Sequence, residues 1–209
     1  MSAARPTRRV VQFGTSRFLQ AHADLFIHEA RAEGQEAGPV TVVQTSGDAA
    51  RAGRVAAFGS PGGYPVIVRG IADGAPVERR ITVTSIARGL SAATDWDAVT
   101  ALVVEEADIL LSNTGDTGYA IPDSDRGGAW VAAHPPASFP GKLAQLLHRR
   151  WQAGGRPLTV LPCELIYRNG RVLRGLVLDL AAEAGLPEAF SAWLREGATF
   201  TDTLVDRIV

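Results

Sequence analysis

The chain has 209 residues, with 21 basic and 22 acidic side chains and a formal net charge of -1. This length suits one domain with a substantial core, and the charge balance argues against a nucleic-acid or membrane-surface partner. The single cysteine, Cys163, cannot form an internal disulfide, and no N-terminal apolar run is long enough for a signal or a membrane span. We therefore expect a cytoplasmic protein that acts on small molecules.

Strand-like apolar runs alternate with amphipathic stretches along the chain, which is typical of helices packed over a mostly parallel sheet. The predicted core strands are, in chain order, 9–13, 40–45, 107–112, 158–163 and 203–209. The predicted helices are 17–33, a short one that ends at Phe58, then 95–104, 140–152, a long one from Asn169 to Gly185, and 188–194. Residues 122–136 are predicted to be a loop in which Trp130 packs against the core.

A hairpin interrupts this alternation. Residues 66–69 and 81–88 are rich in β-branched side chains, and Asp73-Gly74 lies between them. Asp-Gly between two such runs is a strong hairpin signal. The predicted fold class is therefore α/β, a doubly wound and mostly parallel Rossmann-like sheet with a small β-hairpin elaboration.

The end of the first predicted strand is the clearest candidate site. Gly14 follows the strand and a helical pattern begins at once, so the backbone can turn tightly and present free amides to an anion. The usual dinucleotide fingerprint has glycines where this chain has Gly14, Ser16 and Leu19, so one of three is present. The pattern favours a phosphate site, and a simple loop hinge is the alternative.

Several further motifs fall in a fixed order along the chain. They are the runs 13–22 (FGTSRFLQAH), 112–114 (SNT), 139–143 (FPGKL), 161–166 (LPCELI) with Asn169-Gly170, and 203–209 (TLVDRIV). Together these runs resemble the nucleotide-binding half of the mannitol dehydrogenase family, the long-chain polyol dehydrogenases that include tagaturonate and fructuronate reductases. The likeness covers nearly the whole chain and implies one dinucleotide-binding domain over residues 1–209.

The resemblance also implies roles for individual residues. Gly14 to Phe18 would hold the pyrophosphate of a nicotinamide dinucleotide, and Asp206 would hydrogen-bond a substrate hydroxyl as the catalytic residue of this half. An ordinary ion pair between Asp206 and Arg207 is the alternative. The full set of expected cofactor-binding residues is Phe13, Gly14, Thr15, Ser16, Arg17, Phe18, Thr45, Asn113 and Thr114.

The choice between NAD and NADP is set after the second strand, where an acid favours a ribose hydroxyl and an arginine favours a 2′-phosphate. That strand ends Val43-Gln44-Thr45-Ser46 without an acid, and Asp48, Arg51 and Arg54 follow. Asp48 would favour a ribose hydroxyl, whereas Arg51 and Arg54 would favour a 2′-phosphate, so these residues do not choose between the two cofactors. The resemblance favours NAD, with NADP as the alternative.

Other polar residues have less definite readings. Glu164 lies either at the mouth of the cleft beside the nicotinamide or at the turn that leads to Asn169. Lys142, the only lysine, is expected to be a solvated helix residue, and Cys163 a small buried one. No histidines have the spacing of metal ligands, so no metal site is predicted.

The resemblance further implies that the general base is a lysine, supported by an asparagine and a histidine, in a helical second domain that follows the Val-Asp-Arg-Ile strand. This chain ends at that strand, so we expect the C-terminal helical catalytic domain to be absent from it. The prediction is the nucleotide-binding half of an oxidoreductase for a polyol or sugar acid, a poor catalyst until a helical second domain or partner subunit completes it, and one that can self-associate. Leu165 stands where mannitol dehydrogenase itself would have an asparagine, which makes mannitol a weaker candidate. The alternative is a dinucleotide-binding module without catalysis.

Overall fold

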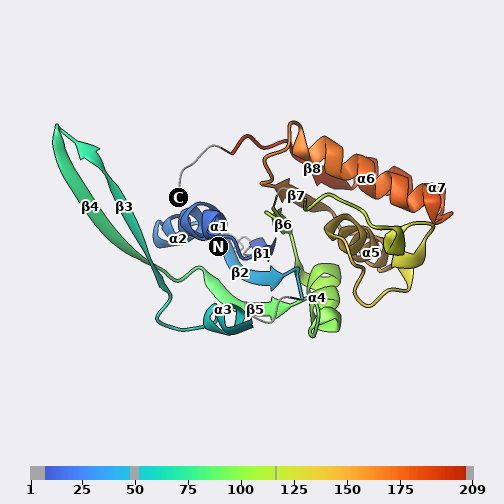
Figure 1. The fold of residues 1–209 in the computed structure, drawn as a ribbon, viewed down its shortest axis with the longest axis horizontal. Helices are drawn as coiled ribbons and strands as arrows, with labels where there is room; N and C mark the ends of the chain where they lie inside the picture. Colours follow the sequence, from blue (N-terminus) through green and yellow to red (C-terminus); the bar gives the residue numbers. More distant parts are fainter. Residues whose placement is uncertain (1–7, 48–51, 116, 206–209) are drawn as a thin grey trace, which may run out of the picture.

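The computed structural model describes residues 8–47, 52–115 and 117–205 (Figure 1). Six strands form one sheet in the order β5-β2-β1-β6-β7-β8, and every neighbouring pair is parallel. Their bounds are β1 Arg8–Phe13, β2 Ala37–Gln44, β5 Ile86–Ser91, β6 Ile109–Ser112, β7 Leu158–Pro162 and β8 Ala198–Phe200. The strand order reverses between β1 and β6, and ligands of open parallel sheets bind at such a switch point, beyond the carboxyl ends of the strands.

Helices cover both faces of this sheet, as predicted. Successive strand side chains point to opposite faces, so Val10 and Val42 enter one apolar cluster while Val11 and Val43 enter another. The first cluster includes Leu19 of α1 and Phe58, which follows α3; the second is formed with α4, its π-helical continuation η2, α5, α6 and α7. The helices are α1 Arg17–Ala21, α2 Ala23–Ala32, α3 Ala52–Ala57, α4 Trp96–Ala101, η2 Leu102–Glu106, α5 Phe139–Gln152, α6 Asn169–Glu183 and α7 Glu188–Glu196.

The predicted hairpin is present and extends away from the body of the molecule (Figure 1). It consists of β3 Tyr64–Ala72 and β4 Ala75–Val83, and its two turn residues, Asp73 and Gly74, have φ of 52° and 77°. The prediction of one strand over 81–88 is wrong, because β4 ends at Val83 and β5 begins at Ile86 in the other sheet. Ser85 causes the break: its hydroxyl donates to the Asp24 carbonyl at 2.7 Å and its own carbonyl accepts from the Val40 N–H at 3.0 Å.

The helix predicted over 17–33 is divided in two. His22 has φ -122° and ψ -89°, which are not helical values, so α1 has only five residues before α2 begins at Ala23. The macrodipole of a helix is the sum of its peptide dipoles, so a helix this short has only a small positive charge at its N-terminus. The positive charge expected at the Gly14 turn must therefore come largely from side chains.

The last strand differs most from the prediction. Residues 203–205 are not in a strand, Asp206 to Val209 lie outside the described residues, and β8 occurs earlier, at Ala198–Phe200. Strand pairing stops because Asn169 binds the next segment. Its side-chain oxygen accepts from the Thr203 N–H at 3.0 Å and its amide group donates to the Thr203 hydroxyl at 2.9 Å.

The segment before α5 is a packed loop with two short 3-10 turns, η3 Asp123–Asp125 and η4 Ala129–Val131. Trp130 is fully buried, as predicted, and its indole N–H donates to the Leu180 carbonyl at 3.4 Å. Lys142 of α5 corrects another expectation, since it is buried and not solvated. In the described part of the chain no helix has the length and apolar character needed to cross a membrane.

Candidate functional site

A cavity of about 430 Å³ lies beyond the carboxyl ends of β1, β2 and β6. It is at the switch point of the sheet, where the fold places its ligands. Residues from three segments line it: Gly14, Thr15 and Ser16 after β1; Gln44, Thr45 and Ser46 at the end of β2; and Asn113, Thr114 and Gly115 after β6, together with Arg54 from α3. Segments up to about a hundred positions apart thus form one site.

Six of the nine predicted cofactor-binding residues line this cavity, namely Gly14, Thr15, Ser16, Thr45, Asn113 and Thr114. The structure does not place the side chain of Phe13 there, because it is fully buried against Phe139, with ring centroids 5.5 Å apart. Arg17 and Phe18 also lie outside the described lining, and the Phe18 ring stacks on the His22 ring with their centroids 4.9 Å apart. The predicted binding role of all nine residues stays a prediction.

Gly14 explains how β1 and β6 come so close at this edge. Its φ is +114°, and a Cβ at this position would overlap the carbonyl oxygen of Asn113. The Gly14 N–H also donates to the Val43 carbonyl at 2.9 Å, which ties the turn to β2. A side chain at position 14 would force β1 and β6 apart, so the turn requires glycine.

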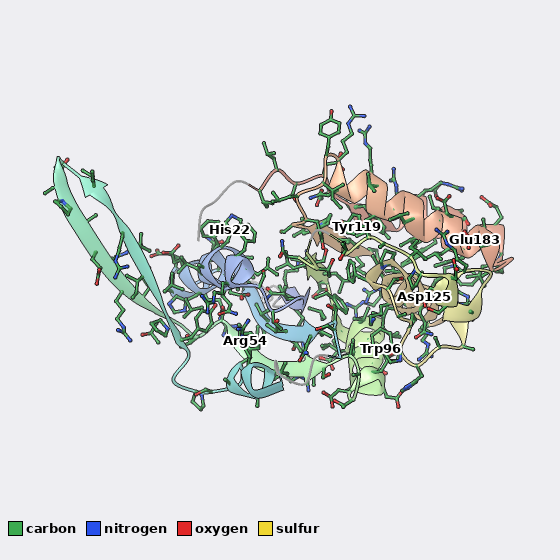
Figure 2. The ribbon with its side chains drawn as sticks, in the orientation of Figure 1. His22, Arg54, Trp96, Tyr119, Asp125 and Glu183 are labelled. Carbon is green, nitrogen blue, oxygen red and sulfur yellow. The ribbon has the colours of Figure 1, made fainter. Side chains whose placement is uncertain are left out.

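Arg54 is the one charged side chain in the described lining of this cavity (Figure 2). Its guanidinium donates to the Thr15 carbonyl at 3.4 Å, which holds it beside the Gly14 turn. Ser16 caps α1, since its hydroxyl oxygen accepts from the Leu19 N–H at 3.2 Å. The cavity therefore offers hydroxyl donors and one cation, which is the chemistry that suits a phosphate. Asp48 and Arg51 lie outside the described residues.

Glu164 holds the segment after β6 in place. Its carboxylate accepts hydrogen bonds from the Ser112 hydroxyl at 3.0 Å, from the Thr114 N–H at 3.1 Å and hydroxyl at 3.0 Å, and from the Tyr119 hydroxyl at 3.1 Å. The side chain is buried, and burial beside this carboxylate raises the pKa of Tyr119. The carboxylate thus faces the segment after β6, and the turn into α6 is bound instead by Asn169.

Gln12 and Asp24 form a buried pair beneath the Gly14 turn that sequence reasoning missed. The Gln12 amide nitrogen lies 3.5 Å from the Gly14 carbonyl and 3.4 Å from the Asp24 carboxylate. Burial raises the pKa of Asp24 to about 7, an effect that its hydrogen bond with Gln12 partly opposes. One signal was available: Gln12 is a polar residue inside an otherwise apolar strand.

An apolar cavity of about 470 Å³ lies next to this site, between the end of β7 and residues 202–205. Three of its lining side chains are far more exposed than is usual for apolar residues: Leu165 at 82%, Tyr167 at 83% and Leu204 at 96%. Exposed apolar side chains that lie together are typical of interaction surfaces.

Cys163 is buried as predicted, and burial raises the pKa of its thiol to about 12.

Residues 8–209 match the family described as "Mannitol dehydrogenase Rossmann domain". The chain is 35% identical over 206 residues to the altronate oxidoreductase of Halalkalibacterium halodurans, covering 96% of this chain and 39% of that protein. It is 33% identical to the altronate oxidoreductase of Bacillus subtilis, covering 96% of this chain and 42% of that one.

Solved structures agree on the fold. Mannitol 2-dehydrogenase of Pseudomonas fluorescens, solved as a ternary complex with NAD and D-mannitol, superposes with a TM-score of 0.77 and 22% identity, over 98% of this chain and 43% of that one. The chain thus spans about two fifths of the length of these relatives. The match over residues 8–209 shows that the chain belongs to the mannitol dehydrogenase family, of which it contains the Rossmann domain.

Proposed function

We propose that this chain is the NAD-binding half of an oxidoreductase that transfers hydride between a nicotinamide and the carbinol carbon of a polyol or aldonate. The observation that carries the proposal is the cavity at the switch point, with the Gly14 turn, five hydroxyl side chains and Arg54 on its walls. Its position and its donors suit a dinucleotide that crosses the ends of β1 and β2.

The lining residues divide naturally along such a ligand. The backbone from Gly14 to Ser16 and the Arg54 guanidinium would hold the pyrophosphate, and Thr45 would face the adenosine ribose. Asn113 and Thr114 would lie at the middle of the ligand, with Asn113 on the nicotinamide side. A bound nicotinamide dinucleotide supplies the hydride acceptor or donor, and the chain's own residues bind and orient it.

NAD is the proposed cofactor, supported by the NAD complex of the Pseudomonas fluorescens relative. NADP is the second candidate, because Arg54 stands near the end of β2, where a 2′-phosphate would lie. For the substrate, the altronate oxidoreductases among the relatives support an aldonate of that kind. Leu165 supports the same choice over mannitol.

Turnover requires groups beyond this chain in our proposal. Asp206 would hydrogen-bond the substrate, and a helical second domain or partner subunit would supply the general base, whose assistance typically contributes about 10²–10⁴-fold. The exposed Leu165, Tyr167 and Leu204 support a partner at this face, or self-association of the chain alone. A dinucleotide-binding module without catalysis is the second candidate, because the one lysine of the chain is buried in α5.

A charge substitution at Ser16 tests the nucleotide site without removing the helix cap. Serine, asparagine and aspartate cap helices about equally well, so Ser16→Asp and Ser16→Asn both keep α1. We expect NADH to quench the tryptophan fluorescence of the wild type and of Ser16→Asn, with at least tenfold weaker binding to Ser16→Asp because its carboxylate repels the pyrophosphate. Equal affinity of the two variants would place the pyrophosphate elsewhere.

A mixing experiment with the rest of a relative separates the two candidate functions. The chain would be mixed with the region that follows the matched segment in the Halalkalibacterium halodurans altronate oxidoreductase. NAD reduction that depends on altronate supports the enzyme half. NADH binding without turnover supports the binding module.

A further inference from the structure

A second cavity, of about 270 Å³, continues the first one between the ends of β2 and β6 and the start of α5. The two cavities share Thr45, Ser46 and Thr114 in their linings. Its lining combines the apolar side chains of Pro122 and Phe139 with the polar ones of Ser138 and Lys142. A flat ring with polar atoms at its edge fits such a lining better than a phosphate does.

Lys142 lines this cavity although it is only 4% exposed. An ammonium group has three N–H donors. Within the described residues, the Lys142 ammonium has one hydrogen bond, to the Ala137 carbonyl at 2.7 Å. The ammonium therefore keeps donors for an acceptor in the cavity.

Asp125, labelled in Figure 2, binds the segment that carries the Ala137 carbonyl, the acceptor of the Lys142 hydrogen bond. Its carboxylate accepts from the Ala137 N–H at 2.9 Å and from the Ser138 N–H at 2.7 Å and hydroxyl at 2.6 Å. Burial lowers the pKa of Lys142 to about 8, and the nearby Asp125 charge opposes that shift. Burying an ammonium without a carboxylate hydrogen-bonded to it is costly, and groups kept in that state cluster at functional sites.

We propose that the second cavity receives the adenine ring of the dinucleotide and that the Lys142 ammonium donates a hydrogen bond to one of its ring nitrogens. The inference rests on the proposed function, because a dinucleotide held at the Gly14 turn with its ribose at Thr45 directs its base into the adjoining cavity. Lys142 thereby distinguishes adenine from bases or ring analogues that lack the acceptor. It is a binding residue for the base and takes no part in hydride transfer.

The test compares ADP-ribose with its 1-deaza, 3-deaza and 7-deaza analogues, each of which replaces one ring nitrogen by carbon. Wild type is expected to bind one of the three about tenfold more weakly than ADP-ribose, the value of one charge-assisted hydrogen bond. In Lys142→Met, which keeps the apolar stem, that ratio falls to about one. A lysine with a structural role alone would leave the ratio unchanged.

Three outcomes overturn the inference: no analogue is discriminated by wild type, the ratio survives in Lys142→Met, or all four ligands weaken equally in the variant. Should Lys142→Met fail to fold, the affinities of the wild type for the four ligands still test the inference. They are compared with those of Lys142→Arg, which keeps the charge but changes its geometry. The Ser16→Asp result keeps the two proposals apart. If Ser16→Asp weakens ADP-ribose while the analogue ratio is insensitive to Lys142, the nucleotide site stands and only the role of Lys142 is wrong.

Discussion

Glu164→Ala removes the acceptor that binds the segment after β6 to the end of β7. The carboxylate is 3% exposed and accepts four hydrogen bonds, three of them from Ser112 and Thr114 and one from Tyr119. The hydroxyl donors can rotate toward other acceptors, but the Thr114 N–H is fixed by the backbone and loses its partner.

Leaving one buried donor unsatisfied costs about 1–3 kcal/mol. Each lost hydrogen bond to a charged group is worth about 1.5–3 kcal/mol, and less where the hydroxyl donor can rotate to another acceptor. Because these terms are not additive, we expect the unfolding free energy to fall by about 3–5 kcal/mol. For a chain of this size the midpoint of thermal unfolding would fall by about 10 °C. The affinity for NADH should fall with it, since Thr114 lines the cavity.

The measurement is urea unfolding followed by tryptophan fluorescence, with NADH titration of the folded variant. Glu164→Gln keeps the shape and one oxygen acceptor but presents an amide group to the same donors, so its loss should be intermediate. Glu196→Ala, on an exposed residue at the end of α7, is the matched control and should change the unfolding free energy by less than about 0.5 kcal/mol. A loss below about 1 kcal/mol for Glu164→Ala would show that the carboxylate does not hold this segment.

Two further substitutions test the region around the Gly14 turn. Gly14→Ala should lower the unfolding free energy by about 3 kcal/mol or more, because a Cβ there overlaps the Asn113 carbonyl and φ is positive. In the control Gly175→Ala, in α6, the added Cβ meets open space, so this variant should be neutral or stabilising in urea melts. Comparable melts for the two variants would contradict the close approach of β1 and β6. Asp24→Asn tests the buried pair. The pKa of Asp24 is about 7 in the folded state against 3.8 in the unfolded state, so between these pH values the folded state binds one proton more. The unfolding free energy of the wild type should therefore fall by a few kcal/mol as pH rises from 4 to 7. The variant should lose that slope and exceed wild type in stability at pH 8, as urea melts at several pH values would show; a slope that persists would assign it to another group.

Local signals in the sequence determined most of the fold. Gly14 after an apolar strand predicted the turn, Asp73-Gly74 predicted the hairpin, and the spacing of apolar residues predicted the helices α5 and α6. These predictions were correct because strand and helix periodicity and turn chemistry depend on residues within a few positions of each other.

What the sequence left open depends on groups far apart in the chain. Glu164 binds Ser112 across 52 positions, and no local pattern shows that a carboxylate after one strand will hold the segment after another. The same holds for Lys142, which was expected in solvent but is buried with its ammonium on the Ala137 carbonyl. It also holds for Ser85, whose bonds to Asp24 and Val40 split a predicted strand between two sheets. The order of residues thus specified the elements and the glycine turn, whereas burial and long-range hydrogen bonding in the folded chain decided which side chains face the cavity.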